Sequence, residues 1–152
     1  MLEPQTINEY TSQRTFSIHE ASWGCQALVL HSFGGMFVGD AIDLAFLATD
    51  HLDLPFEING LRISQPCDDE AVEYERTFGV ALKLEEPVGK RVFAVESAGK
   101  RFHVIAAKLW VLIRPHDPSL SLSPLLDSNS ECRDDFINEH LKEWYKMDSL
   151  GG

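Results

Sequence analysis

Residues 101–114 constrain the fold more than any other segment, because they are apolar on both faces of an extended chain. One face would carry Phe102, Val104, Ala106, Trp110 and Leu112, and the other Ile105, Ala107, Leu109, Val111 and Ile113. Such a strand belongs in the middle of a sheet that is covered on both sides. It would be about 45 Å long at about 3.3 Å per residue, so we expect a bend or bulge near residues 106–108.

Shorter strands are predicted elsewhere from the alternation of apolar and polar residues. One segment is ambiguous, because Asp40 is also a suitable cap for a short helix over the residues that follow it. Turns are expected at residues 87–90 and 97–100. The predicted strands are residues 14–20, 27–33, 41–50 (the ambiguous segment), 77–84 and 91–96.

The most specific local signal is Asn59-Gly60, within residues 55–64. Both residues tolerate the positive φ that a type I′ turn requires. A tight hairpin there would place Ile58 opposite Leu61, with apolar pairs at alternate rungs. The sequence therefore predicts a hairpin at this point.

Residues 131–146 are predicted to form a C-terminal helix, with acidic residues in its first turns and lysines in its last. Its apolar stripe would consist of Phe136, Ile137, Leu141, Trp144 and Tyr145. We expect an α+β fold, a mainly antiparallel sheet or sandwich with this helix packed on it. Residues 1–152 would form a single globular domain, with residues 1–13 as a loose arm.

The formal net charge of −11 is unevenly distributed along the chain. Residues 1–75 contain 13 acidic residues and only two bases, Arg14 and Arg62, whereas residues 76–152 contain 11 of each. An acidic half repels nucleic acid and anionic membranes, because both bind through lysine and arginine. The charge favours a basic protein partner or metal cations; it is also the charge of an ordinary soluble protein.

The three cysteines, Cys25, Cys67 and Cys132, are odd in number and contain no Cys-x-x-Cys pair. A disulfide framework is therefore not indicated, and a reducing, cytoplasmic location is expected. The N-terminus has neither a basic start nor an apolar run, so no secretory signal is predicted. No apolar run is long enough to span a bilayer.

Residues 65–75 are predicted to be an acidic loop or short turn that contains a proline. Its acidic residues have no lysine or arginine among them and lie next to a tyrosine, a residue common in interfaces. An ordinary solvated loop explains the same composition. The predicted partner-binding residues are Asp68, Asp69, Glu70, Glu73, Tyr74 and Glu75.

A weaker alternative is a metal or acid–base site formed by Asp40, Asp50, His51 and Asp53. Carboxylates with a histidine suit a divalent cation, although the loose spacing also fits a solvated surface. The sequence lacks the G-x-S-x-G, phosphate-loop, H-E-x-x-H and EF-hand motifs. We therefore predict no catalytic residue and no cofactor, and lean against an enzyme.

The chain ends in Gly151-Gly152, which resembles the terminus of ubiquitin-like modifiers. That resemblance covers two residues and implies conjugation through the terminal glycine. The tail equally fits the C-cap of a helix. The predicted function is a non-catalytic acidic protein-binding module, such as an inhibitor or immunity-type protein covering a basic partner. A small enzyme or ligand-binding domain and a conjugated modifier are the alternatives.

Overall fold

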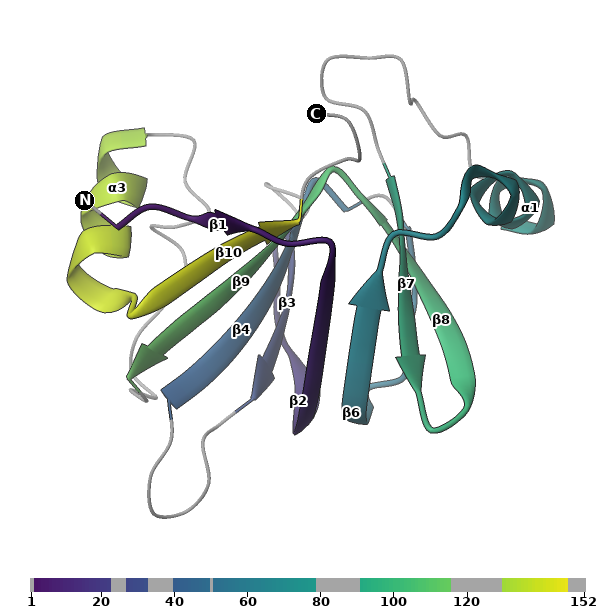
Figure 1. The fold of residues 1–152 in the computed structure, drawn as a ribbon, viewed down its shortest axis with the longest axis horizontal. Helices are drawn as coiled ribbons and strands as arrows, with labels where there is room; N and C mark the ends of the chain where they lie inside the picture. Colours follow the sequence, from purple (N-terminus) through teal and green to yellow (C-terminus); the bar gives the residue numbers. More distant parts are fainter. Residues whose placement is uncertain are drawn as a thin grey trace.

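The computed structural model describes residues 2–22, 27–32, 40–49, 51–78, 91–115 and 130–147, which form a mainly β structure with short helices (Figure 1). Its elements are β1 (Gln5–Thr6), β2 (Glu9–Ser22), β3 (Ala27–Ser32), β4 (Asp40–Leu47), β5 (His51–Asp53), β6 (Glu57–Ser64), α1 (Asp68–Phe78), β7 (Arg91–Ser97), β8 (Lys100–Ala106), β9 (Lys108–Pro115), α3 (Ser130–His140) and β10 (Glu143–Met147). The described strands form one sheet in the order β1-β10-β9-β4-β3-β2-β6-β7-β8-β5. The sheet is mixed, because β1 runs parallel to β10 while the other pairs are antiparallel.

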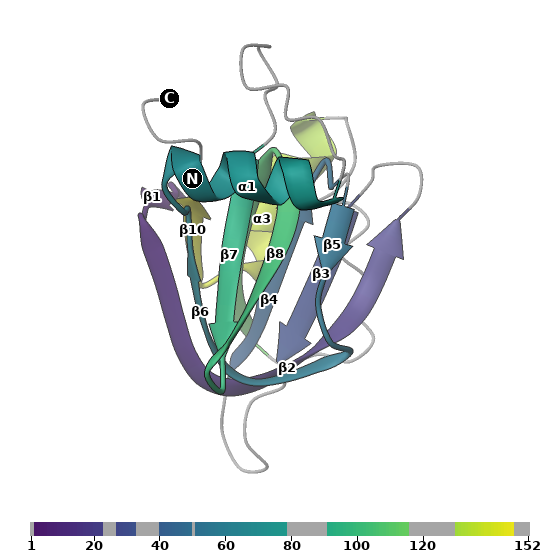
Figure 2. The same cartoon turned by 90° about the vertical axis from the view of Figure 1, so that its right-hand side faces the viewer.

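The sheet curves until strands that are distant in its order face one another. Phe46 on β4 and Phe93 on β7 are in edge contact, with ring centroids 5.7 Å apart, although β3, β2 and β6 lie between their strands. Both belong to one buried cluster that draws side chains from both ends of the sheet. The long strand β2 makes the bend, and Figure 2 shows it curving beneath the other strands. Register shifts at Ser12/Thr15 and Ile18/Glu20 mark two irregularities in β2, and such bulges bend a strand.

The bend predicted near residues 106–108 is confirmed. The apolar segment is divided at Ala107 into β8, which lies between β7 and β5, and β9, which lies between β4 and β10. The Ala107 N–H donates a hydrogen bond of 2.9 Å to the carbonyl of Leu47, which fixes the point where the chain passes from β8 to β9. Strand β9 is buried on both faces, as predicted, because Val111 points into the first core cluster and Leu112 into a second one.

The hairpin predicted at Asn59-Gly60 is wrong, because both residues lie inside the continuous strand β6. Gly60 has the expected positive φ of 73°. It lies opposite the bulge of β2, where the register between β2 and β6 shifts, and not in a turn. A regular strand alternates every second residue. The irregularity changes that spacing so that Ile58, Leu61 and Ile63 all reach the core. The turn predicted at residues 97–100 is confirmed, and Ala98 and Gly99 both have positive φ.

The C-terminal segment also differs from the prediction. The helix ends at His140 instead of residue 146, and Glu143–Met147 is the strand β10, paired with β9. As a strand, β10 sends Trp144 to the second core cluster and its neighbour Tyr145 to the first. Helix α3 contributes Phe136 and Ile137 to the second cluster, and Leu141 follows directly after the helix. The sheet contributes Val29, Ala45, Trp110 and Leu112.

Other predicted segments agree in part. The strands predicted at residues 14–20, 27–33, 41–50 and 91–96 correspond to β2, β3, β4 and β7. The expected arm at residues 1–13 contains β1 and the start of β2, and the expected acidic loop is the helix α1. That helix includes Thr77 and Phe78, the start of a predicted strand whose remainder, with the turn at residues 87–90, lies outside the described residues. No helix in the described part of the chain is long and apolar enough to cross a membrane.

Phe93 is fully buried and contacts Phe46 from the other part of the sheet, so we expect its truncation to destabilise the protein strongly. Phe93→Ala should lower the free energy of unfolding by about 3 to 5 kcal/mol, measured by urea denaturation, because it leaves a cavity in the shared core. Phe56→Ala is the control, since Phe56 is 74% exposed and its loss should change the value by less than about 0.5 kcal/mol. Equal effects of the two variants would contradict the described core.

Candidate functional site

A row of alternating charges crosses the outer face of four adjacent strands. The register places Thr11 of β2, Arg62 of β6, Glu96 of β7 and Arg101 of β8 side by side. Glu9 extends the row at one end and Glu70 of α1 at the other, since they bind Arg62 and Arg101 respectively. We call Glu9, Arg62, Glu96, Arg101 and Glu70 the charged ladder. Opposite charges on neighbouring strands stabilise a sheet and fix its solvent-facing side chains.

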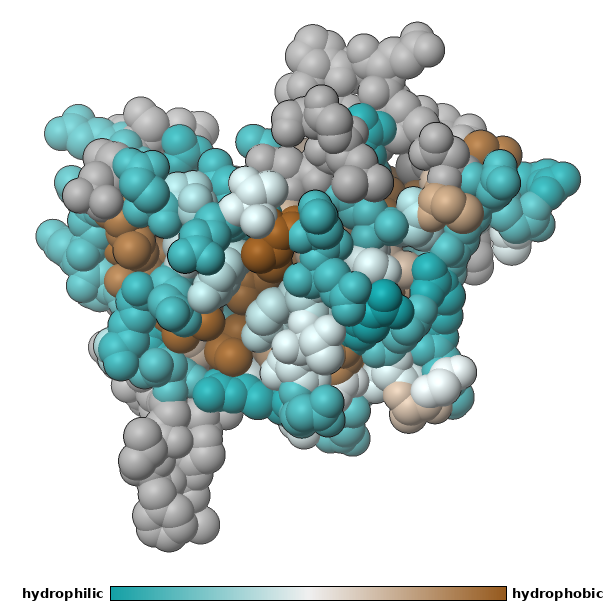
Figure 3. All heavy atoms as spheres, viewed as in Figure 1, coloured by the Kyte–Doolittle hydropathy of each residue, from teal (hydrophilic) through white to brown (hydrophobic). Residues whose placement is uncertain are grey.

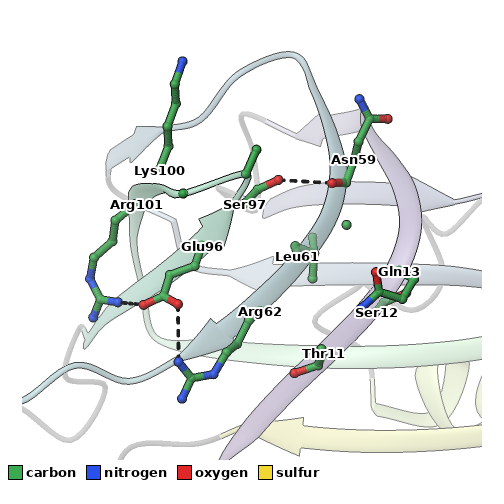
Figure 4. Close-up of a pocket in the computed structure, with 13 residues that line it drawn as sticks. Thr11, Ser12, Gln13, Asn59, Leu61, Arg62, Glu96, Ser97, Lys100 and Arg101 are labelled. Carbon is green, nitrogen blue, oxygen red and sulfur yellow. Dashed lines mark hydrogen bonds and ion pairs between the residues drawn. The ribbon is translucent and has the colours of Figure 1, made fainter.

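Three carboxylates share two guanidinium groups in the charged ladder. Arg62 donates from Nε and Nη2 to Glu9 at 2.6 and 3.0 Å, and its Nη1 lies 3.3 Å from Glu96. Arg101 bonds both oxygens of Glu70 and also Glu96 (Figure 4 draws the contacts to Glu96). Hydrogen bonds from the arginines lower the pKa of Glu9 and Glu70, and the same bonds raise the pKa of both arginines. Glu9, Glu70 and the two arginines are therefore held in their charged forms. The ladder contains one more carboxylate than guanidinium groups.

A groove of about 550 Å³ lies beside the charged ladder, at the end of β7. Ser97 Oγ donates a hydrogen bond of 3.3 Å to the main-chain carbonyl of Asn59 across it (Figure 4). The surface over β6, β7 and β8 is mostly hydrophilic (Figure 3). The groove is lined by Thr11, Ser12 and Gln13 of β2, Asn59, Gly60, Leu61 and Arg62 of β6, and Glu96–Arg101 around the β7–β8 turn.

Helix α1 is fastened to the outer face of β7 and β8 through one aromatic side chain and one carboxylate. Tyr74 is buried in a small cluster with Val92 and Ile105, and its ring lies 4.6 Å from the ring of His103. His103 Nε2 is 3.0 Å from a carboxylate oxygen of Glu70. Burial and the charge of Asp53 raise the pKa of Tyr74 to about 12, so its hydroxyl stays protonated.

The predicted partner-binding residues all lie on α1, but they divide into two groups. Glu70 and Tyr74 face the sheet and hold the helix in place. Asp69 and Glu73 are exposed on the outer side, where Glu73 also pairs with Arg76. Val72, which the sequence did not assign to any site, is 58% exposed on the same helix. The side chains of Asp68 and Glu75 lie outside the described residues.

Several acidic residues of the first half of the chain pair with bases of the second half. Asp40 lies 3.1 Å from Lys142, in addition to the pairs Glu70–Arg101 and Glu73–Arg76. The one-sided charge of the sequence is thus partly neutralised in the folded protein. Within the described part of the chain, an acidic surface for a partner can be formed only by the carboxylates that stay exposed.

Two residues of the weaker metal alternative, Asp40 and Asp53, have described side chains, and they lie on different strands of the sheet. Asp40 begins β4, whereas Asp53 ends β5 at the far edge of the sheet, opposite His103. The side chains of Asp50 and His51 lie outside the described residues, as do Gly151 and Gly152. Among the described residues no three histidine, cysteine or carboxylate side chains are grouped to hold a metal ion.

A buried polar triad, missed in the sequence, lies on the face of the sheet that carries the second core cluster. Asp43 of β4 accepts from Arg114 Nε of β9 at 2.8 Å, and His31 Nδ1 of β3 lies 2.5 Å from its other oxygen. The three side chains are 0 to 3% exposed. The sequence signal was a charged or imidazole residue among the apolar residues of each of three strands. A histidine–carboxylate pair can act as a base. The three side chains are buried, so a substrate cannot reach them. Their role is structural, because they connect β3, β4 and β9.

Comparison with known proteins provides no guide to function, since no protein-family model, curated protein or solved structure matches the chain. The candidate site comprises the outer face of α1, the charged ladder and the groove.

Breaking the buried triad should cost much more than replacing it. Asp43→Ala leaves Arg114 buried without its carboxylate, so the free energy of unfolding should fall by about 3 to 5 kcal/mol in urea denaturation. The triple variant H31F/D43L/R114M removes the charges together and should lose less than Asp43→Ala. A larger loss in the triple variant would contradict the assignment of the triad as a mutually compensated network.

The lowered pKa of Glu70 predicts how the stability depends on pH. A carboxyl whose pKa is lower in the folded state stabilises the protein above its ordinary value of 4.5, and the contribution disappears as the pH falls through the folded value. Glu70→Gln should therefore be less stable than wild type at neutral pH, with the gap closing under acid conditions. Glu57→Gln, at an exposed position of β6, is the control, and an equal gap in this variant in the same urea titrations would contradict the prediction.

Proposed function

We propose that this chain is a non-catalytic protein-binding module that docks a basic partner through the outer face of α1, as an inhibitor or immunity-type protein would. The observation that carries the proposal is an exposed apolar side chain beside exposed carboxylates on a fastened helix. Val72 is 58% exposed, and Asp69 and Glu73 are exposed near it on α1. Buried apolar contacts with charged neighbours are the usual composition of an interface centre and its rim.

The attachment of α1 supports this role. Tyr74 and Glu70 fix the helix to β7 and β8, so that its outer side chains are held in place before a partner arrives. A preformed surface loses less conformational entropy on binding than a mobile loop does. The net charge of −11 would accelerate encounter with a cationic partner, most strongly at low salt.

The charged ladder extends the acidic surface beside α1. The ladder carries one more carboxylate than guanidinium groups, and each of its arginines is bonded to two carboxylates. These arginines are therefore committed to acidic side chains of the same chain. A basic partner meets a net negative face, which favours the proposed charge complementarity.

The variant D69N/E73Q tests the proposal, because it removes two carboxylates from the outer face of α1. Affinity capture with quantitative mass spectrometry should show a cationic protein that binds wild type at low salt, binds less at high salt, and is lost from the variant. The matched control is D135N/E139Q on α3, which removes an aspartate and a glutamate at the same spacing. Equal capture by both variants would contradict a binding role for α1.

A further inference from the structure

The two guanidinium groups that line the groove are held in matching ways. Arg62 binds both oxygens of Glu9 through Nε and Nη2, at 2.6 and 3.0 Å. Arg101 binds both oxygens of Glu70 through the same two nitrogens. Bidentate pairing fixes the plane and the direction of a guanidinium group. The third nitrogen of each group, Nη1, is therefore held in a fixed position from which it can bind another anion.

The two Nη1 atoms converge on one carboxylate. Glu96 of β7 lies between Arg62 and Arg101 in the strand register. One of its oxygens accepts from Nη1 of Arg62 and the other from Nη1 of Arg101 (Figure 4). Two guanidinium donors directed at different oxygens of one anion form an arrangement that is complementary to an oxyanion. Glu96 thus occupies the position that the anionic group of a ligand would take.

Glu96 is the carboxylate of the charged ladder that can exchange most easily. It receives one donor from each arginine, whereas Glu9 and Glu70 each receive two from a single arginine. Its bond to Arg62 is 3.3 Å long, which is beyond the usual range. The side chain of Glu96 is 36% exposed, and ion pairs in contact with solvent contribute little to stability. Its release would leave both bidentate pairs intact.

The groove beside this position has the size and the polarity of a small-molecule site. Its volume of about 550 Å³ lies within the usual range of ligand pockets. Lys100 is exposed at the β7–β8 turn and points away from the other labelled side chains, so it adds positive charge at the border of the groove (Figure 4). The charged residues that line the groove are Arg62, Lys100, Arg101 and Glu96. Hydroxyl and amide side chains come from β2, β6 and β7: Thr11, Ser12, Gln13, Asn59 and Ser97.

We propose that the groove binds a small phosphorylated ligand, whose phosphate group replaces the carboxylate of Glu96 between Arg62 and Arg101. This site goes beyond the protein-binding function proposed for the outer face of α1. The ligand must compete with a carboxylate that is tethered beside the arginines, so a second monocarboxylate gains little. A phosphate monoester carries a charge of about −1.5 to −2 at neutral pH and three acceptor oxygens, so it binds the same donors more strongly. The hydroxyl and amide groups of the groove would bind the polar remainder of the ligand.

The probe is glycerol phosphate, titrated into the isotope-labelled full chain and followed by NMR at the arginine side chains and the main-chain amides. The side-chain N–H signals of Arg62 and Arg101 and the amide signal of Ser97 should shift and saturate. Acetate at equal ionic strength is the control, and it should leave these signals nearly unchanged. Absence of shifts with glycerol phosphate, or equal shifts with acetate, would overturn the proposal.

Glu96→Gln tests the exchange itself, because it removes the competing carboxylate and keeps the size of the side chain. The dissociation constant for glycerol phosphate should fall about tenfold, since the arginines no longer have to release a partner before the ligand binds. Glu139→Gln is the matched control. It removes the same charge from a 72% exposed position on α3, at the other end of the molecule from α1 (Figure 1). An equal gain of affinity in both variants would reveal a general effect of charge and refute the exchange.

Arg62→Gln tests the place of binding, because it removes one of the two converging donors. The affinity for glycerol phosphate should fall by about tenfold or more, as expected for the loss of a hydrogen bond to a charged group. Arg76→Gln on α1 removes the same charge outside the groove and should retain the affinity. Both arginines are exposed, so both variants should fold, which their amide spectra would verify. Equal affinities of the two variants would show that the phosphate binds elsewhere.

Discussion

The whole architecture depends on β2 pairing with two different strands along its length. Its first part pairs with β6 and its last part with β3, and Ser17 has a register partner on each side. A flat strand could not do this and also bring Phe46 and Phe93 together, because β4 and β7 are separated by three strands in the sheet. The two bulges supply the bend. The shared core, the passage from β8 to β9 at Ala107 and the groove beside Gly60 all depend on that bend.

The sequence predicts the apolar strands well, because burial determines their residue types independently of their partners. It fails where one local signal serves two structures. A positive φ at Asn59-Gly60 fits a hairpin or a bulge, and only the long-range pairing of β6 with β2 selects the bulge. Likewise, Trp144 and Tyr145 extend a helical stripe, yet in a strand they reach two different cores. The acidic segment became a helix because Ala71 and Tyr74 both pack on β7 and β8.

The candidate surfaces were only partly predictable for a related reason. The acidic residues of α1 are visible in the sequence, but the division into anchoring and exposed carboxylates depends on which side of the helix meets Arg101. The buried triad is harder to predict. Asp43 is 12 residues from His31 and 71 residues from Arg114, so only the order of β3, β4 and β9 brings the three together. A buried carboxylate that bonds to two strands also opposes a shift in register, since a shift would leave charges unpaired in the core.

The charged ladder determines what the guanidinium groups beside the groove can bind. A guanidinium with free donors would reach into the gap and bind anions directly. Arg62 and Arg101 are each bonded to two carboxylates, so their donors are directed along the row of strands. The groove is lined by hydroxyl, amide and main-chain groups together with Arg62, Glu96, Lys100 and Arg101. Binding an anion through Arg62 or Arg101 would therefore require the guanidinium to release one of its carboxylates.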